Sequence, residues 1–408
     1  MALNAIVVAG AGWVTLGESA GTDAANLWLV GVAVVHAGVG LGGRFLRVSN
    51  DIRLLALAIG VVVADVSFGL IVDGPALAIG WAVTGVGFAA LLRSMPRQVD
   101  RDAAMLTEVG LGGHLALAML SAIAVSDPAP VLQGTQPLSM AGAASIIALA
   151  AGCLVSARIA GERHENWRAA LDAMGLIAIA VLTAMRLDGV DLVIAWSLEV
   201  AALAGIAHRM NDEVAAVGAL GFLALAGAHA VLFEAPPGSL VTGLAEPSAG
   251  VAALAAVAAC LVLLGALADP AQARARTVLR GLAGLTLLYL ASTVVVTPFE
   301  TDAAVDSALL SAHQQGQMVL SVFWGLVGVG TIVVGLRRDL GIVRLAGLAL
   351  LGVTIGKVFL FDLATLTSMY RVVSFVGLGL LLLGGALVWQ RLRPQELADL
   401  RQTPAGIR

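Results

Sequence analysis

The sequence predicts an all-α, polytopic transmembrane bundle, and three observations support this prediction. The chain has 408 residues, of which 59% are hydrophobic and only 12% charged, whereas soluble domains carry about 25% charged residues. Its mean hydropathy is +0.96, and its 48 glycines suit membrane helices, where small residues let backbones approach closely. Apolar runs long enough to cross a bilayer, which takes roughly 20 residues as a helix, follow one another along the chain.

Fourteen such runs can be delimited, because each is followed by a short link of polar, glycine or proline residues. Some links are tight turns (VDGP, RLDG), some are proline-rich (SDPAPVLQGTQP, EAPPGSLVTGLAEP) and some are charged (RSMPRQVDRD, RIAGERHENWR). The first run lacks a basic leader, so we expect a helix there rather than a cleaved signal peptide. We expect helices, in order, at residues 2–16, 27–43, 52–72, 75–92, 105–125, 138–157, 169–185, 191–207, 214–233, 248–268, 278–297, 313–336, 340–361 and 372–390.

The positions of the arginines predict the orientation of these helices. Cytoplasmic loops carry an excess of Lys and Arg, and alternate loops of this chain are basic. The odd-numbered loops hold only Arg186 and Arg371, whereas the even-numbered loops hold Arg44, Arg47, Arg53, Arg93, Arg97, Arg101, Arg158, Arg163, Arg168, Arg209, Arg274, Arg276, Arg280, Arg337, Arg338 and Arg344. This alternation favours fourteen helices with both termini cytoplasmic, in the plasma (inner) membrane.

The chain also shows an internal repeat. A shift of 115 residues places Arg53 on Arg168, Trp81 on Trp196, and one Asp-Gly pair on another. Trp324 recurs at a similar place before an arginine, and we expect the three tryptophans to anchor at the membrane interface. We therefore divide a single membrane domain, residues 1–393, into a leading pair at 1–43 and parallel four-helix units at about 53–157, 168–268 and 280–391, followed by a tail at 394–408. The alternative is that low-complexity apolar sequence aligns with itself.

Lys357 is the only lysine of the chain and lies within an apolar run. It is about 20 Å along a helix from Arg344, and a charge at the centre of a membrane costs about 2.5–3.5 kcal/mol on insertion scales. Asp362 and Arg371 could form an outer-face cluster with it. One interpretation is a charge cluster that fixes the last hairpin, and the other is a contact to a substrate or ion. We expect an acid, Asp65, Glu199 or Asp362, within salt-bridge reach of the lysine.

Glu199 is the charge closest to mid-bilayer, because it lies about 12–15 Å from either end of its run. An ionisable residue at this depth is by default a functional candidate, although a neutral glutamic acid hydrogen-bonded between helices is the alternative. Asp65 lies at a depth like that of Lys357. It is either an ion partner of that lysine or faces a water-filled vestibule.

No pattern in the chain predicts catalysis, a metal site or a cofactor. No serine within the runs has a base nearby, and no HExxH or CxxC spacing occurs. The histidines within or near the runs (His36, His114 and His229) are interpreted as interhelical hydrogen-bond partners, and Cys153 and Cys260 as small apolar residues. No basic cluster with interleaved aromatics appears, so we expect membrane lipids and no nucleic acid as partners.

The C-terminal stretch IGKVFLFDLATLTSMYRVVSFVGLGLLLLGGALVWQR resembles the predicted bacterial integral membrane proteins called domain of unknown function 2339. The resemblance rests on a lysine, an Asp-Leu, an arginine, a Ser-Phe and a Leu-Gly, which fall here on Lys357, Asp362-Leu363, Arg371, Ser374-Phe375 and Leu378-Gly379. The segments at residues 313–339 and 196–200 are also similar. The resemblance implies a multi-pass membrane protein and no established activity.

Three function hypotheses follow. A transporter or flippase-like protein of the cell envelope is favoured by the many helices, the repeat and the few deep charges. A non-catalytic scaffold or envelope-assembly component is favoured by the scarcity of polar residues that could line a path. A membrane-embedded enzyme has the least support. A cavity around Glu199 would favour the first hypothesis, and a solid apolar bundle the second.

Overall fold

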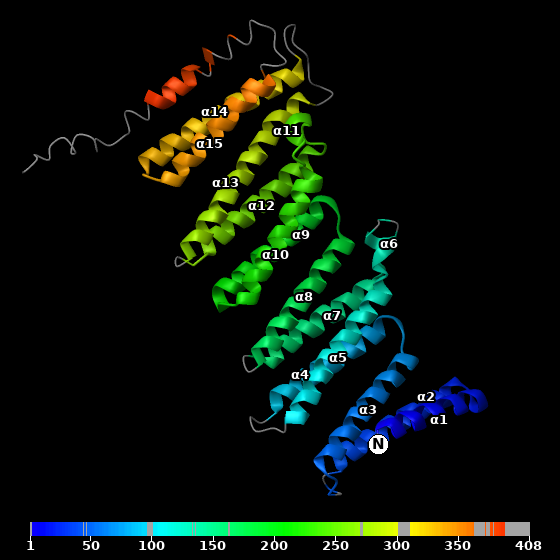
Figure 1. Ribbon diagram of the computed structural model, residues 1–408. Coiled ribbons are helices and arrows are strands. Elements are labelled where there is room, and N and C mark those ends of the chain that lie inside the picture. The colour runs from blue at the N-terminus through cyan, green and yellow to red at the C-terminus, as the bar shows by residue number, and fades with distance from the viewer. Residues whose placement is uncertain are drawn as a thin grey trace, which may run out of the picture. The chain divides into compact units, whose positions relative to one another are not determined.

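The computed structural model describes an all-helical protein (Figure 1). The described residues are 2–43, 45, 47–95, 101–132, 134, 136–161, 164–269, 272–300, 311–362, 372, 376–377 and 379–387. Every regular element within them is helical, and twelve of their helices are long and apolar enough to cross a membrane. The predicted fold class, a polytopic helical membrane bundle, is therefore confirmed.

The observed helices follow the predicted runs closely. Each of the twelve spans lies over one of the runs from the second to the thirteenth. The first run forms α1 (Ala2–Ala20), which is not among the twelve. Of the fourteenth run, predicted at 372–390, residues 372, 376–377 and 379–387 are described and are helical, whereas the tail at 394–408 lies outside the described residues.

The chain forms two compact units, and the first comprises residues 1–222. This boundary falls inside the predicted repeat unit at 168–268. The division of the chain into a leading pair and three four-helix units therefore stays a prediction. The helices of the first unit are α1 (Ala2–Ala20), α2 (Thr22–Gly42), α3 (Asn50–Ile71), α4 (Gly74–Ser94), α5 (Arg101–Ser126), the short α6 (Pro128–Leu132), α7 (Met140–Ala160), α8 (Glu165–Arg186), α9 (Gly189–Met210) and the beginning of α10 (Glu213–His229).

Two hairpins of the first unit have matching bounds. Helices α3 and α8 begin 115 residues apart and end 115 residues apart, and α4 and α9 begin at the same offset. Both turns pass through an Asp-Gly pair whose glycine has a positive φ, 60° at Gly74 and 55° at Gly189. Glycine adopts this backbone conformation without the cost that a Cβ would impose, which explains why so short a turn can reverse the chain at both places.

Tryptophans occupy equivalent places in these hairpins. Trp81 and Trp196 are 9% and 6% exposed, and each faces a residue one turn before the end of the preceding helix. Trp81 meets Phe68 edge-on at 6.0 Å between ring centroids, and Trp196 bonds to Thr183. The expectation that these two side chains anchor at the membrane interface is wrong, since both are buried within the protein.

The core of the first unit lies around α4, α5, α7 and α8, whose mutual packing is extensive. It is built of small and aliphatic side chains, because helix pairs in membranes associate through close packing rather than exclusion of water. A smaller cluster joins α1, α2 and α3. Large apolar side chains elsewhere on the helices are exposed, Leu198 and Val217 at 66% and 68%, as expected of surfaces that face lipid.

The second unit comprises residues 223–408. After the rest of α10 it contains a π-helical turn (Ala230–Glu234), α11 (Ser239–Thr242), α12 (Pro247–Leu267), α13 (Ala273–Val296), a 3₁₀ turn (Thr297–Phe299), α14 (Ala312–Arg337), α15 (Gly341–Lys357) and a second π-helical turn (Val358–Asp362). Its closest pairs are α12 with α13 and α14 with α15. Ser311 starts α14 with a reciprocal capping box to Gln314, which satisfies two backbone N–H groups at that end.

Candidate functional site

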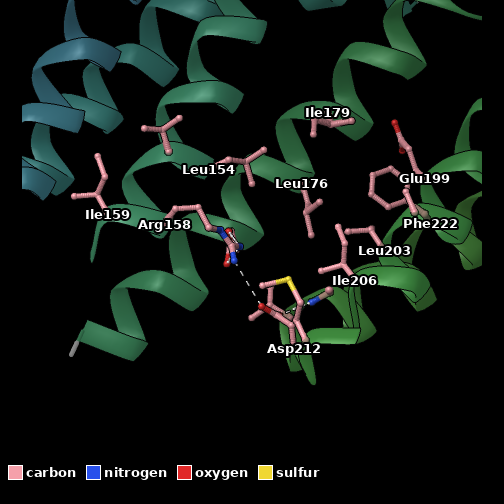
Figure 2. Close-up of a pocket in the computed structure, with 16 residues that line it drawn as sticks. Leu154, Arg158, Ile159, Leu176, Ile179, Glu199, Leu203, Ile206, Asp212 and Phe222 are labelled. Carbon is pink, nitrogen blue, oxygen red and sulfur yellow. Dashed lines mark hydrogen bonds and ion pairs between the residues drawn. The ribbon is translucent and has the colours of Figure 1, made fainter. Parts of the chain in front are cut away.

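A pocket of about 650 Å³ opens within the first unit between α7, α8, α9 and the start of α10. Figure 2 shows its 16 lining residues. Most of them are aliphatic, and they include Leu154, Leu176, Leu203 and Ile206. The four ionisable side chains among them are Arg158, Asp172, Asp212 and Glu199. The pocket is therefore an apolar chamber with charged groups at separate positions.

Glu199 enters the pocket from the middle of α9. It is the eleventh residue of this 22-residue helix, so about 15 Å of helix separates it from either end. Its Oε2 atom is buried and has no hydrogen-bond partner among the described residues. The ring of Phe222 lies beside it, and Arg158 and Asp212 lie apart from both (Figure 2). The sequence-predicted depth of Glu199 thus coincides with a cavity.

The other charged residues of the pocket belong to an ion-pair network. Arg158 Nη2 of α7 lies 2.5 Å from both carboxylate oxygens of Asp172 on α8. Arg168, one turn before Asp172, bonds to Asp212 beyond the end of α9. Weaker contacts of 3.8 Å join Arg158 to Asp212 and Arg168 to Asp172. Two guanidinium groups thus face two carboxylates, and the network carries no net charge.

Asp212 also caps the N-terminus of α10, in addition to its ion pairs. Its Oδ1 accepts a hydrogen bond of 3.0 Å from the backbone N–H of Ala215, which is the geometry of a helix N-cap. Burial alone would raise the pKa of Asp212. The Ala215 N–H and the guanidinium groups of Arg168 and Arg158 outweigh burial and hold the pKa below its usual value. The carboxylate is therefore charged at neutral pH.

Asp65 has a partner within its own unit. Its Oδ1 lies 3.0 Å from His114 Nε2 of α5, and His114 Nδ1 bonds to the Gly110 carbonyl oxygen at 2.6 Å. The ring of His114 also stacks on Phe88. The interpretation of His114 as an interhelical hydrogen-bond partner therefore agrees with the geometry, and Asp65 does not need Lys357 as its counter-ion.

Lys357 lies at the end of α15 and reaches back to α14. Its Nζ donates to the carbonyl oxygen of Gln317 at 3.0 Å and to Ser321 Oγ at 2.9 Å. Gln317 in turn donates from Nε2 to the Leu240 carbonyl oxygen of α11 at 2.9 Å. The lysine thus ties α15 to α14 near the ends of these helices. An acidic partner for Lys357 stays a prediction.

The last two predicted site residues, Asp362 and Arg371, belong to a stretch that the structure describes only in part. Arg371 and the side chain of Asp362 lie outside the described residues, as do Leu363, Ser374, Phe375 and Leu378. No group of His, Cys, Asp and Glu side chains within the described part of the chain is arranged to hold a metal ion.

One stretch in the C-terminal part of the chain matches a known family model. Residues 242–392 match DUF2339, a predicted membrane protein. The expected resemblance is confirmed over this stretch, which is less than half of the chain and contains Lys357, Gln317 and Ser321. No curated protein and no solved structure matches the chain. The chain is therefore a predicted multi-pass membrane protein with a DUF2339 segment, a domain of unknown function.

The DUF2339 segment does not include the pocket, whose lining ends at Phe222. The network residues Asp172 and Asp212 were not among the sequence-based candidates. The sequence does contain a pattern that could have indicated Asp172. This residue lies within an apolar run, four residues after Arg168, and that spacing places both side chains on one face of a helix. The link from Asp212 to Arg168 spans 44 residues, and no local pattern indicates it.

Proposed function

We propose that this protein is a transporter or flippase-like protein that moves an amphipathic molecule across the membrane, and that the pocket of the first unit receives it. The pocket that reaches Glu199 is the single observation that supports transport over a scaffold. A scaffold gains nothing from a chamber of this size, whereas ligand pockets of about 300–1,000 Å³ with apolar walls and a few placed polar groups are typical of small-molecule sites.

The proposal includes an orientation. The arginines favour the plasma (inner) membrane with both termini cytoplasmic. The network of Arg158, Arg168, Asp172 and Asp212 would then lie at the cytoplasmic end of the pocket, and Glu199 would lie near mid-membrane. Neutral ion pairs at that end hold α7, α8 and the start of α10 together without closing the chamber.

The test uses purified protein in liposomes. Three fluorescent probes are followed in parallel: a zwitterionic phospholipid, an anionic phospholipid and the lipophilic cation rhodamine 6G. We expect at least one probe to cross faster than in protein-free liposomes, and Ala202→Phe, which fills the pocket, to slow it. Ala90→Phe on the exposed side of α4 is the matched control. If no probe crosses faster than in protein-free liposomes, transport is contradicted and the scaffold hypothesis is favoured.

A further inference from the structure

The unpartnered carboxyl of Glu199 limits what the pocket can hold. An unpaired charge in apolar surroundings is strongly unfavourable, so Glu199 needs either a proton or a positive partner. No basic side chain of the pocket takes that role, because Arg158 lies at the other end and already faces Asp172 at 2.5 Å. When Glu199 carries its charge, its positive partner would therefore come with the ligand.

The surroundings of Glu199 suit a cation with an apolar body. The walls next to it are aliphatic, and Phe222, which is 4% exposed, presents its ring beside the carboxyl (Figure 2). Aromatic faces attract cations, most strongly where water is excluded. A small hydrated ion would lose its water here without gaining oxygen ligands, whereas a lipophilic cation loses little on entry.

Glu199 has no acidic counterpart in the matching hairpin of α3 and α4, so a hairpin of this kind does not require a carboxyl at that position. The offset of 115 residues between α4 and α9 places Thr84 where α9 has Glu199. Among the described residues, the Thr84 hydroxyl donates to the Gly80 carbonyl oxygen of its own helix alone. Leu57 similarly stands where α8 has Asp172. A hairpin with closely matching helix bounds therefore forms without these charges, and the carboxyl has no evident structural task.

We propose that the pocket of the first unit binds lipophilic monovalent cations, with Glu199 as the counter-ion that selects their charge. This inference rests on the proposed function, since it names the class of molecule that the same pocket would receive. An anionic ligand is disfavoured because each guanidinium of the network already has a carboxylate, so that end presents no free positive charge.

The experiment compares two probes of one shape and opposite charge, tetraphenylphosphonium and tetraphenylborate. Equilibrium binding of each is measured on purified full-length protein in nanodiscs, with protein-free nanodiscs as blanks. We expect tetraphenylphosphonium to bind and tetraphenylborate not to bind above the blank. Glu199→Gln preserves the size of the side chain and should weaken tetraphenylphosphonium binding about tenfold or more. Glu165→Gln, on an exposed carboxyl at the start of α8, should not change binding.

A second variant separates shape from charge. Ala202→Phe fills the pocket and should abolish binding of the cation. If the two probes bind equally and Glu199→Gln affects neither, while Ala202→Phe weakens both, the pocket selects by shape and the inference is overturned. Preferential binding of tetraphenylborate, or binding of neither probe, also overturns it. Cation binding without transport of any probe would contradict the proposed function and leave the inference intact.

Discussion

Trp196 Nε1 of α9 donates a hydrogen bond of 2.9 Å to Thr183 Oγ1 of α8, whereas Trp81 Nε1 of the α3–α4 hairpin is buried with no acceptor among the described residues. Phe68 occupies the place of Thr183 in that hairpin and offers only a ring edge. Two hairpins of matching bounds therefore hold their tryptophans by different interactions.

This difference predicts unequal costs for the same substitution. Trp196→Phe removes a hydrogen bond and should lower the free energy of unfolding by about 1 kcal/mol more than Trp81→Phe, because the latter removes a buried N–H that has no acceptor. Unfolding by SDS titration measures both. Thr183→Val should cost as much as the tryptophan change, and the double variant little more than either. Equal costs for the two tryptophans would contradict the pairing.

The network at the start of α10 predicts a graded loss on changing Asp212. Asp212→Asn loses the charge but keeps an oxygen that can cap the helix, whereas Asp212→Ala loses both. We expect the asparagine variant to lose about 1–3 kcal/mol of unfolding free energy and the alanine variant more. Glu213→Gln, on the exposed neighbouring residue, should behave like the parent. The measurement is thermal unfolding in detergent.

The same carboxylate predicts a pH dependence of stability. Because the pKa of Asp212 is lowered in the folded protein, its contribution is fully present above the unfolded value, about 3.9, and is lost as pH falls through the lower folded value. The difference in unfolding free energy between parent and Asp212→Asn should therefore be constant from pH 7 to about pH 5 and shrink below about pH 4. A difference that persists to pH 2 would refute the network as its source.

Close packing of α14 and α15 predicts a strict requirement for glycine at 347. A Cβ there would lie 2.8 Å from the Gly328 carbonyl oxygen and 2.9 Å from the backbone nitrogen of Ile332. Backbone atoms cannot yield without moving a helix, so Gly347→Ala should cost about 1–3 kcal/mol. Gly352→Ala on the same helix is the matched control, since a Cβ there meets nothing within 4 Å. Equal stability of the two variants in SDS titration would show that the helices are not packed this closely.

Two substitutions separate the contribution of the hydrogen-bond acceptors of Lys357 from the contribution of its charge. Ser321→Ala leaves the ammonium group with one fewer acceptor and should cost about 1.5–3 kcal/mol, as for hydrogen bonds to charged groups. Lys357→Met removes the charge together with its need for acceptors and should cost less. Thr331→Val is the control, because within the described part of the chain this hydroxyl donates to no group other than the Val327 carbonyl oxygen of its own helix. If Lys357→Met is the more destabilising change, the lysine has a stabilising ion partner.

The sequence by itself determined the class of protein and where its helices lie. Bilayer thickness fixes the length of an apolar run, and proline, glycine and charged links end it, so the twelve spans appear within a few residues of their predicted bounds. The depth of Glu199 followed in the same way, because the rise per residue of a helix is constant. These are local properties, and a single sequence contains them.

Only the tertiary structure decided which side chains meet. Asp65 finds His114 across 49 residues, Arg168 finds Asp212 across 44, and the pocket beside Glu199 exists because α7, α8, α9 and α10 leave space that their side chains do not fill. Apolar helices in lipid gain almost equally from many packings, so hydropathy does not select among them. Partners and cavities are therefore set by the detailed fit of side chains, which a pattern of apolar runs does not contain.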